Sequence, residues 1–277
     1  MTSIGIGTWS WGNQFLWGYI PERDDRVLEE TFNNAINNGI TLVDTADSYG
    51  IGKLNGRSEE LLGKFLKKLP FSKSKNLIIA TKLAPYPWRI GRRGFKEAFF
   101  ASKLRLNNKL DRVQLHWSTS IYAPWQEMQL MDGICDLFEE GIVSEIGISN
   151  MGVNRLRWFY QRMQARSIPI KSLQIQFSLL SPDFQKFSEL ISLCKQLNIE
   201  LLAYSPLAMG VLAIPPSTNL RPQIPITFLR RRLFSRLLPA SFKLRQALNE
   251  IATERGVSQA QVALNWCRSH GTIPIVG

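Results

Sequence analysis

The chain has 277 residues, enough for one large α/β barrel or two modest domains. Of these, 44% are hydrophobic, an ordinary fraction for a soluble globular protein, and the formal net charge is +12. It contains no uncharged apolar run of roughly 18 residues or more, so no membrane span is expected, and the segment from Met1 to Trp11 lacks the basic and apolar regions of a signal peptide. The basic residues accompany no zinc-finger, RNA-recognition or basic-zipper pattern, so nucleic-acid binding is not expected either.

Short apolar segments alternate with amphipathic segments along the chain. The predicted strands are Ile4–Gly7, Thr41–Val43, Leu77–Ala80, Val113–Leu115, Ser144–Gly147, Ser172–Ile175, Leu201–Ala203 and Ile273–Val276. The predicted helices between them are Asp24–Asn38, Ser58–Leu69, Gly94–Leu106, Trp125–Glu140, Asn154–Arg166, Phe184–Leu197 and Ser241–Arg255. This alternation is typical of repeated βα units and a parallel sheet.

The number of these segments predicts an α/β fold, a single (β/α)8 TIM barrel over residues 1–277. A doubly wound sheet fits less well, because no Gly-x-Gly-x-x-Gly sequence opens a helix. The segment from Ala213 to Pro239 contains five prolines and is predicted to be a long loop. Three widely spaced cysteines, which form no CxxC pair, predict reduced thiols in the cytoplasm or, in a plant, the plastid stroma, and no metal site is expected.

Polar side chains stand at the ends of three consecutive predicted strands. Asp44 follows the second strand, Lys82 the third and His116 the fourth, and Tyr49 lies in the loop after the second. Because catalytic side chains of such barrels come from the carboxyl ends of strands and the following loops, these four groups are predicted to meet at one rim.

Together the four groups suit the reduction of a carbonyl. A lysine ammonium close to a tyrosine favours the phenolate, so Lys82 is expected to lower the pKa of Tyr49 from its usual value of about 10. Asp44 would hold Lys82, and His116 would donate to a carbonyl oxygen. The hydride must come from a cofactor. Taken singly, Asp44 and Lys82 also fit a structural ion pair, and His116 fits a structural histidine.

The segment from Asp44 to Gly50, Asp-Thr-Ala-Asp-Ser-Tyr-Gly, resembles the aldo-keto reductase family, and the resemblance extends over the chain through Thr-Lys at 81–82, Gln-Leu-His-Trp at 114–117 and Tyr-Ser-Pro-Leu at 204–207. It implies that Asp44, Tyr49, Lys82 and His116 are the catalytic tetrad, with Tyr49 as general acid. It also implies NADPH (NADP+) as cofactor and a small-molecule carbonyl compound as substrate.

The same resemblance implies a set of cofactor contacts. Ser149, Asn150 and Gln174 would hold the nicotinamide carboxamide, and Tyr204 would stack on its ring. Ser205, Leu207 and Gly210 would lie along the pyrophosphate. The residues alone leave simpler interpretations open, because Ser149 and Asn150 can cap a helix and Tyr204 can belong to the core.

A closer likeness is to the plant plastid pyridoxal reductases and their cyanobacterial relatives, which reduce pyridoxal to pyridoxine with NADPH. It is carried by segments such as Gly-Thr-Trp-Ser-Trp-Gly at 7–12 and Tyr-Pro-Trp-Arg at 86–89. Aromatic residues on three of the rim loops are predicted to form a pocket for a flat ring: Trp9, Trp17, Tyr86, Trp88 and Trp117.

Two features of the family pattern are absent. Relatives continue beyond Gly277 with a loop for the adenosine 2′-phosphate and a last helix, and they begin with a hairpin under the barrel, so a barrel lacking both is expected. Arg221 and the arginines at 230–232 are alternative phosphate contacts, although a solvated basic face is the favoured interpretation. A cofactor-binding sensor or interaction subunit with impaired catalysis, or a truncated inactive product, is the alternative function.

Overall fold

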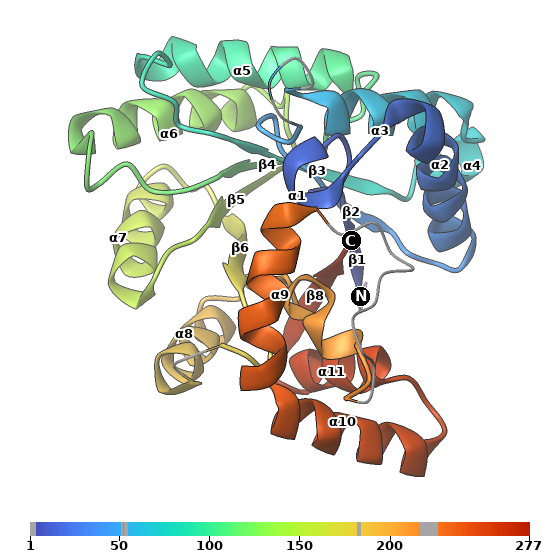
Figure 1. Cartoon of the computed structure of the whole chain (residues 1–277). Helices are drawn as coiled ribbons and strands as arrows, with labels where there is room; N and C mark the ends of the chain where they lie inside the picture. Colours follow the sequence, from blue (N-terminus) through green and yellow to red (C-terminus); the bar gives the residue numbers. More distant parts are fainter. Residues whose placement is uncertain (1–3, 51, 53–54, 182–183, 217–226) are drawn as a thin grey trace.

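Eight parallel strands form a closed barrel in the computed structural model, which describes residues 4–50, 52, 55–181, 184–216 and 227–277. Each strand pairs with the next one in the chain, and the last pairs with the first. The strands are β1 (Gly5–Gly7), β2 (Leu42–Asp44), β3 (Ile78–Leu83), β4 (Arg112–Leu115), β5 (Glu145–Ser149), β6 (Ile170–Gln176), β7 (Glu200–Tyr204) and β8 (Thr272–Val276). The predicted TIM barrel and all its predicted strands are confirmed, with ends that differ by a few residues (Figure 1).

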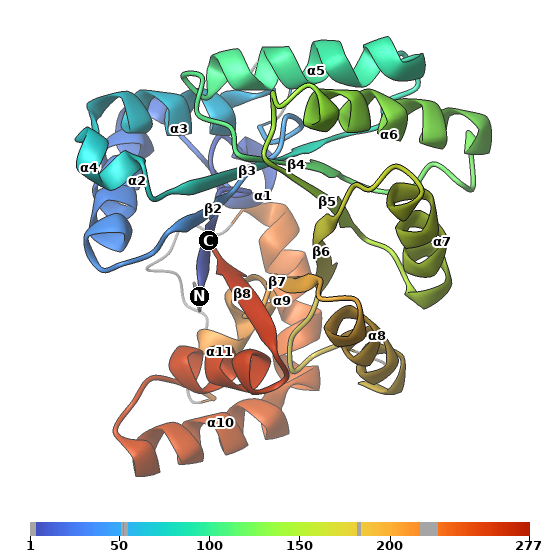
Figure 2. The same ribbon diagram turned by 180° about the vertical axis from the view of Figure 1, so that it is seen from behind.

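Helices surround the barrel, as Figure 2 shows from behind. The longer ones are α2 (Pro21–Asn37), α3 (Arg57–Lys68), α5 (Gly91–Arg105), α6 (Pro124–Glu139), α7 (Val153–Gln164), α8 (Phe184–Gln196), α9 (Phe228–Ala240), α10 (Phe242–Arg255) and α11 (Gln259–Ser269). Short helical turns are α1 (Gln14–Trp17), α4 (Phe71–Ser74) and the 3-10 segment η2 (Ala208–Ala213). In the described residues no helix combines the length and the apolar character that a membrane span requires.

The helix α3 shows how sequence produces this wall. Leu61, Leu62, Phe65 and Leu66 recur at helical spacing and are buried against the barrel. Gly63 lies on the neighbouring face, where a Cβ atom would collide with the backbone carbonyl of Arg105 at the end of α5. A side chain there is therefore excluded by the close packing of α3 against α5.

A buried cation lies at the amino-terminal end of the barrel. Arg112, at the start of β4, is 1% exposed, and its Nη2 lies 2.6 Å from Glu145 Oε2 on β5 and 2.9 Å from Glu200 Oε2 on β7. These ion pairs link the starts of β4, β5 and β7 at the end of the barrel opposite the carboxyl ends of the strands.

The prediction of one long loop over Ala213 to Pro239 is wrong, because α9 occupies its second half. The Thr227 side chain caps α9 by accepting from Arg230 N at 3.4 Å, and Phe234 and Leu238 are buried against residues of η2 and α10. The apolar residues of this segment recur at helical spacing and favour a helix. The prolines do not prevent it, because Pro239, the proline within α9, stands in the last turn. Helix α11 was also not predicted, although Ser258 and Gln261 form a capping box at its start.

Candidate active site

A cavity of about 740 Å³ lies at the carboxyl ends of the strands. Its wall contains all four predicted catalytic residues and all seven predicted cofactor contacts: Asp44, Tyr49, Lys82, His116, Ser149, Asn150, Gln174, Tyr204, Ser205, Leu207 and Gly210. The barrel topology explains this convergence, because successive parallel strands deliver their carboxyl ends to one rim. At 740 Å³ the cavity is large enough for a cofactor-sized ligand.

The centre of the site is a buried ammonium with three acceptors. Lys82 Nζ lies 2.5 Å from Asp44 Oδ2, 2.9 Å from the carbonyl oxygen of Thr45 and 3.1 Å from Tyr49 Oη. Both Lys82 and Asp44 are almost completely buried. All three donors of the ammonium are therefore used, which fixes the charge beside the phenol.

The carboxylate of Asp44 is fixed from its other side. Its Oδ1 accepts from Gln174 Nε2 at 2.9 Å and from Gln114 Nε2 at 3.2 Å. Gln174 was expected to hold a carboxamide, and here its side chain contacts the cavity and also supports Asp44. Gln114 was not singled out from the sequence, although it stands two residues before His116 and so points into the barrel beside it.

The environment of Tyr49 favours its neutral form. Burial raises its pKa above the ordinary value, and the nearby Lys82 charge lowers it by less. The expectation that Lys82 lowers this pKa is therefore corrected, because burial of the phenol outweighs the Lys82 charge. Burial alone would lower the pKa of Lys82, but Asp44 and Tyr49 outweigh it and raise that pKa. The site holds a protonated phenol next to a permanent ammonium.

His116 follows β4 and faces Tyr49, with the two ring centroids 5.9 Å apart. Burial and the Lys82 charge hold the pKa of His116 well below its ordinary value, so the imidazole is neutral at neutral pH. Its Nδ1 atom lies 3.3 Å from Ser48 Oγ, a residue that lines the cavity and was not singled out from the sequence. The sequence feature that could have identified Ser48 is its position directly before Tyr49.

Asn150 and Tyr204 both line the cavity and are hydrogen-bonded to each other. Tyr204 Oη donates to Asn150 Oδ1 at 2.9 Å, and Asn150 Nδ2 donates to the carbonyl oxygen of His116 at 3.0 Å. Ser149 Oγ donates to the carbonyl oxygen of Gln174 at 3.1 Å. These contacts keep the ring of Tyr204 and the amide of Asn150 in fixed positions at the cavity wall.

Beyond β7, the backbone bends sharply around the cavity. Ser205, Ala208 and Met209 have φ values of 51°, 48° and 57°, and Gly210 has 99°. Left-handed conformations of this kind are unfavourable for residues other than glycine. The N–H groups of Ala208 and Gly210 donate to the carbonyl oxygens of Ser205 and Leu207, both at 2.9 Å, so the segment forms tight turns at the cavity wall.

Arg230 on α9 reaches the same side of the cavity. Its guanidinium stacks on Trp17 of α1 at 4.3 Å, and Nη2 donates to the carbonyl oxygen of Met209 at 3.2 Å. Its Nε is buried and has no hydrogen-bond partner among the described residues. Thr227 Oγ1 donates to the carbonyl oxygen of Leu16 at 2.8 Å, which fastens α9 to α1.

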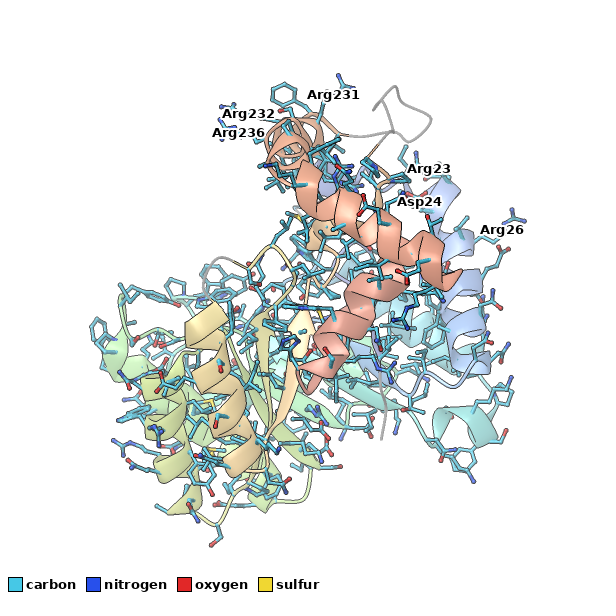
Figure 3. All side chains as sticks on the ribbon, turned by 90° about the horizontal axis from the view of Figure 1, so that it is seen from below. Arg23, Asp24, Arg26, Arg231, Arg232 and Arg236 are labelled. Carbon is cyan, nitrogen blue, oxygen red and sulfur yellow. The ribbon has the colours of Figure 1, made fainter. Side chains whose placement is uncertain are left out.

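The neighbouring arginines differ from Arg230. Arg231 and Arg232 are exposed, and Figure 3 shows them pointing away from the molecule. The prediction of a solvated basic face is therefore confirmed for these two and wrong for Arg230, which lines the cavity. Arg221 lies outside the described residues.

The predicted aromatic pocket divides into two groups. Trp9 and Trp17 line the cavity and meet edge to face at 6.0 Å. In contrast, Tyr86, Trp88 and Trp117 are not part of the cavity wall. Tyr86 stacks on Trp88 at 4.5 Å and meets Trp117 at 6.2 Å, so these three rings form a separate cluster beside the mouth.

A buried ion pair lies beside the second group. Arg89 Nη1 lies 2.5 Å from Asp47 Oδ2 and 2.6 Å from the carbonyl oxygen of Ala84, and its guanidinium packs on the Tyr86 ring at 5.0 Å. The loop after β3 is thereby linked to the loop after β2.

Comparison with known proteins gives a consistent result. The model of the Aldo/keto reductase family matches residues 3–277. The chain is 46% identical over 280 residues to the chloroplastic pyridoxal reductase of Arabidopsis thaliana, covering all of this chain and 75% of that protein. It is 28% identical over 310 residues to versiconal hemiacetal acetate reductase of Aspergillus parasiticus, covering 85% of that protein.

Among solved structures, the glycerol dehydrogenase of Gluconobacter oxydans superposes with a TM-score of 0.76. The match covers 99% of this chain and 81% of that one at 23% sequence identity, and it supports the fold.

Proposed function

The chain belongs to the aldo/keto reductase family of NAD(P)-dependent oxidoreductases, and we propose that it reduces a small aldehyde or ketone with NADPH, Tyr49 being the general acid. One observation carries this proposal: Lys82 contacts Asp44 and Tyr49 at the same time, inside a cavity that also contains His116, Asn150 and Tyr204. The four groups are in place to protonate an oxygen atom while electrons reach its carbon.

Each side chain has a distinct part in the proposed reaction. Tyr49 Oη accepts from Lys82, so its own hydrogen is free to be donated to a carbonyl oxygen in the cavity. When the proton leaves, the Lys82 ammonium stabilises the phenolate. Asp44 keeps that ammonium in position, and His116 donates a second hydrogen bond to the oxygen. The cofactor supplies the hydride when it is bound.

The residues of the cavity fit a nicotinamide dinucleotide. Asn150 offers an amide and Tyr204 a fixed aromatic face to a carboxamide-bearing ring. The segment from Ser205 to Gly210 lines the cavity beside them, and the unpartnered Nε of Arg230 offers a donor to a phosphate group. The preference for NADPH over NADH rests on the resemblance set out above.

We propose pyridoxal as the substrate to test first. The relative with 46% identity is named a pyridoxal reductase, and the perpendicular pair of Trp9 and Trp17 at the cavity wall suits a flat aromatic ring. The three cysteines of the chain are free and buried, which supports a reducing compartment such as the cytoplasm or the plastid stroma.

The deciding experiment mixes the purified protein with NADPH and pyridoxal and follows the nicotinamide absorbance. Loss of absorbance that requires pyridoxal, together with pyridoxine among the products, supports the proposal. A panel of aryl and aliphatic aldehydes tests the wider substrate class. Tight NADPH binding without turnover of any carbonyl compound would refute the proposed activity and favour a cofactor-binding sensor.

A further inference from the structure

We infer that Ser48 is a positioning residue for His116: its hydroxyl donates to Nδ1 and holds the imidazole as the tautomer that carries its proton on Nε2. The ring then presents an N–H donor to the carbonyl oxygen of the substrate. The inference deepens the proposed function and rests on it for its catalytic meaning, but the tautomer itself is a property of the protein without substrate.

The contact that supports this role is direct. Ser48 Oγ lies 3.3 Å from His116 Nδ1, and both residues line the cavity. Ser48 precedes Tyr49, so one loop carries both the proposed acid and the hydroxyl that contacts the imidazole. Any movement of this loop would change both groups together.

Because His116 is neutral, its tautomer decides what it can do. A neutral imidazole has one N–H, and the other nitrogen is an acceptor. Burial and the Lys82 charge keep the pKa of His116 low, so a second proton is not available. A donor at Nδ1 therefore leaves the proton on Nε2, whereas an acceptor at Nδ1 would take it away from there.

Ser48 has a second polar neighbour besides His116. Its hydroxyl is also hydrogen-bonded to the Tyr86 side chain, and a hydroxyl can donate one hydrogen bond while it accepts another. The direction toward His116 follows from the proposed function: Nε2 must carry the proton to donate to a carbonyl oxygen, so Nδ1 accepts, and the Ser48 hydroxyl is within reach to donate to it.

Tyr86 is itself held in place. Its ring packs on the Arg89 guanidinium at 5.0 Å, and Arg89 lies 2.5 Å from the buried Asp47. The aromatic cluster beside the mouth therefore holds in place the side chain that contacts Ser48.

The chain contains its own reference for the opposite tautomer. It has two histidines, and the other one, His270, has Nδ1 2.8 Å from the carbonyl oxygen of Trp266. A carbonyl oxygen only accepts, so Nδ1 of His270 must carry a proton. The two histidines are therefore expected to differ in the ring nitrogen that is protonated.

Nuclear magnetic resonance of the protein labelled with 15N-histidine tests this directly, with a His270→Gln variant to assign the signals. Long-range correlations should show the proton of His116 on Nε2 and that of His270 on Nδ1. In Ser48→Ala, His116 should lose its single tautomer while His270 is unchanged, and Ser48→Thr should restore it. A proton on Nδ1 of His116 in the wild type, or an unchanged pattern in Ser48→Ala, would overturn the inference.

Kinetics give the second measurement, on an active preparation with pyridoxal or another accepted aldehyde. Ser48→Ala should lower kcat about tenfold, the effect of one hydrogen bond, with little change in KM. Ser48→Thr should recover most of it, and Ser235→Ala on the exposed side of α9 is the matched control. A fall in kcat with an unchanged tautomer would also overturn the inference. If no aldehyde is turned over, the proposed function fails while the spectrum still reports on Ser48.

Discussion

Lys82 donates a hydrogen bond to Tyr49 across 3.1 Å, and this contact gives the phenol a defined direction. With its oxygen accepting from the ammonium, the phenol hydrogen points elsewhere, and the cavity is where a substrate oxygen can take it. The pair joins a permanent charge to a group that burial keeps protonated.

Replacing Tyr49→Phe should abolish turnover and leave cofactor binding intact, because only the hydroxyl is removed. A positioned general acid contributes about 10²–10⁴-fold, so kcat should fall by at least about 100-fold. NADPH titration by fluorescence and steady-state kinetics measure the two effects. Tyr160→Phe on α7 is the control, and a Tyr49→Phe enzyme that keeps its rate would exclude the phenol as the acid.

Replacing Lys82→Met should destabilise the barrel by about 3–5 kcal/mol, since the charge of Asp44 would remain buried without its partner. Urea denaturation followed by circular dichroism measures this change. Lys64→Met on the exposed side of α3 should have little effect. The double variant Asp44→Asn with Lys82→Met should be more stable than Lys82→Met alone, and the reverse order would contradict a buried ion pair.

The pH dependence of reduction distinguishes the two influences on Tyr49. The acid must be protonated, so activity is lost as pH rises through its pKa. Burial raises that pKa above its usual value of about 10, and kcat/KM should stay level from about pH 7.5 to pH 10. A decline that begins below about pH 9 would mean that the Lys82 charge outweighs burial.

Replacing Arg230→Ala should weaken NADPH and NADH binding to the same degree, about 10- to 100-fold, if the guanidinium meets the pyrophosphate. Arg230→Lys should recover only part of the affinity, because the planar donor group is lost. The exposed pair Arg231→Ala and Arg232→Ala serves as control. A loss confined to NADPH would place the contact at the 2′-phosphate, and unchanged affinity for both would remove Arg230 from the site.

The barrel strands could be predicted because they are brief apolar segments at regular intervals, and the polar residues that follow them mark the rim. The helix α9 could not, because prolines stand near both of its ends and hide the apolar stripe of Phe234 and Leu238. Because the helix was not predicted, its three adjacent arginines could not be told apart. Successive residues of a helix point about 100° apart, so only a known helix frame separates Arg230 from its neighbours.

The aromatic residues show a second limit of the sequence. Tyr86 and Trp9 both stand in rim loops, yet only Trp9 lines the cavity. Tyr86 packs on Arg89, which pairs with Asp47, a residue 42 positions away in the chain. No local sequence pattern predicts such a contact.

The left-handed segment after β7 also bears on any attempt to make this protein more heat-resistant. Ala208 and Met209 hold a conformation that costs L-residues about 1–2 kcal/mol each. Glycine at these positions would remove that conformational cost, but it would also let the segment adopt several backbone conformations. Substitutions that raise stability at Ala208 and Met209 would therefore make this part of the cavity wall less well ordered for a ligand. Substitutions intended to raise the melting temperature should be made elsewhere in the barrel.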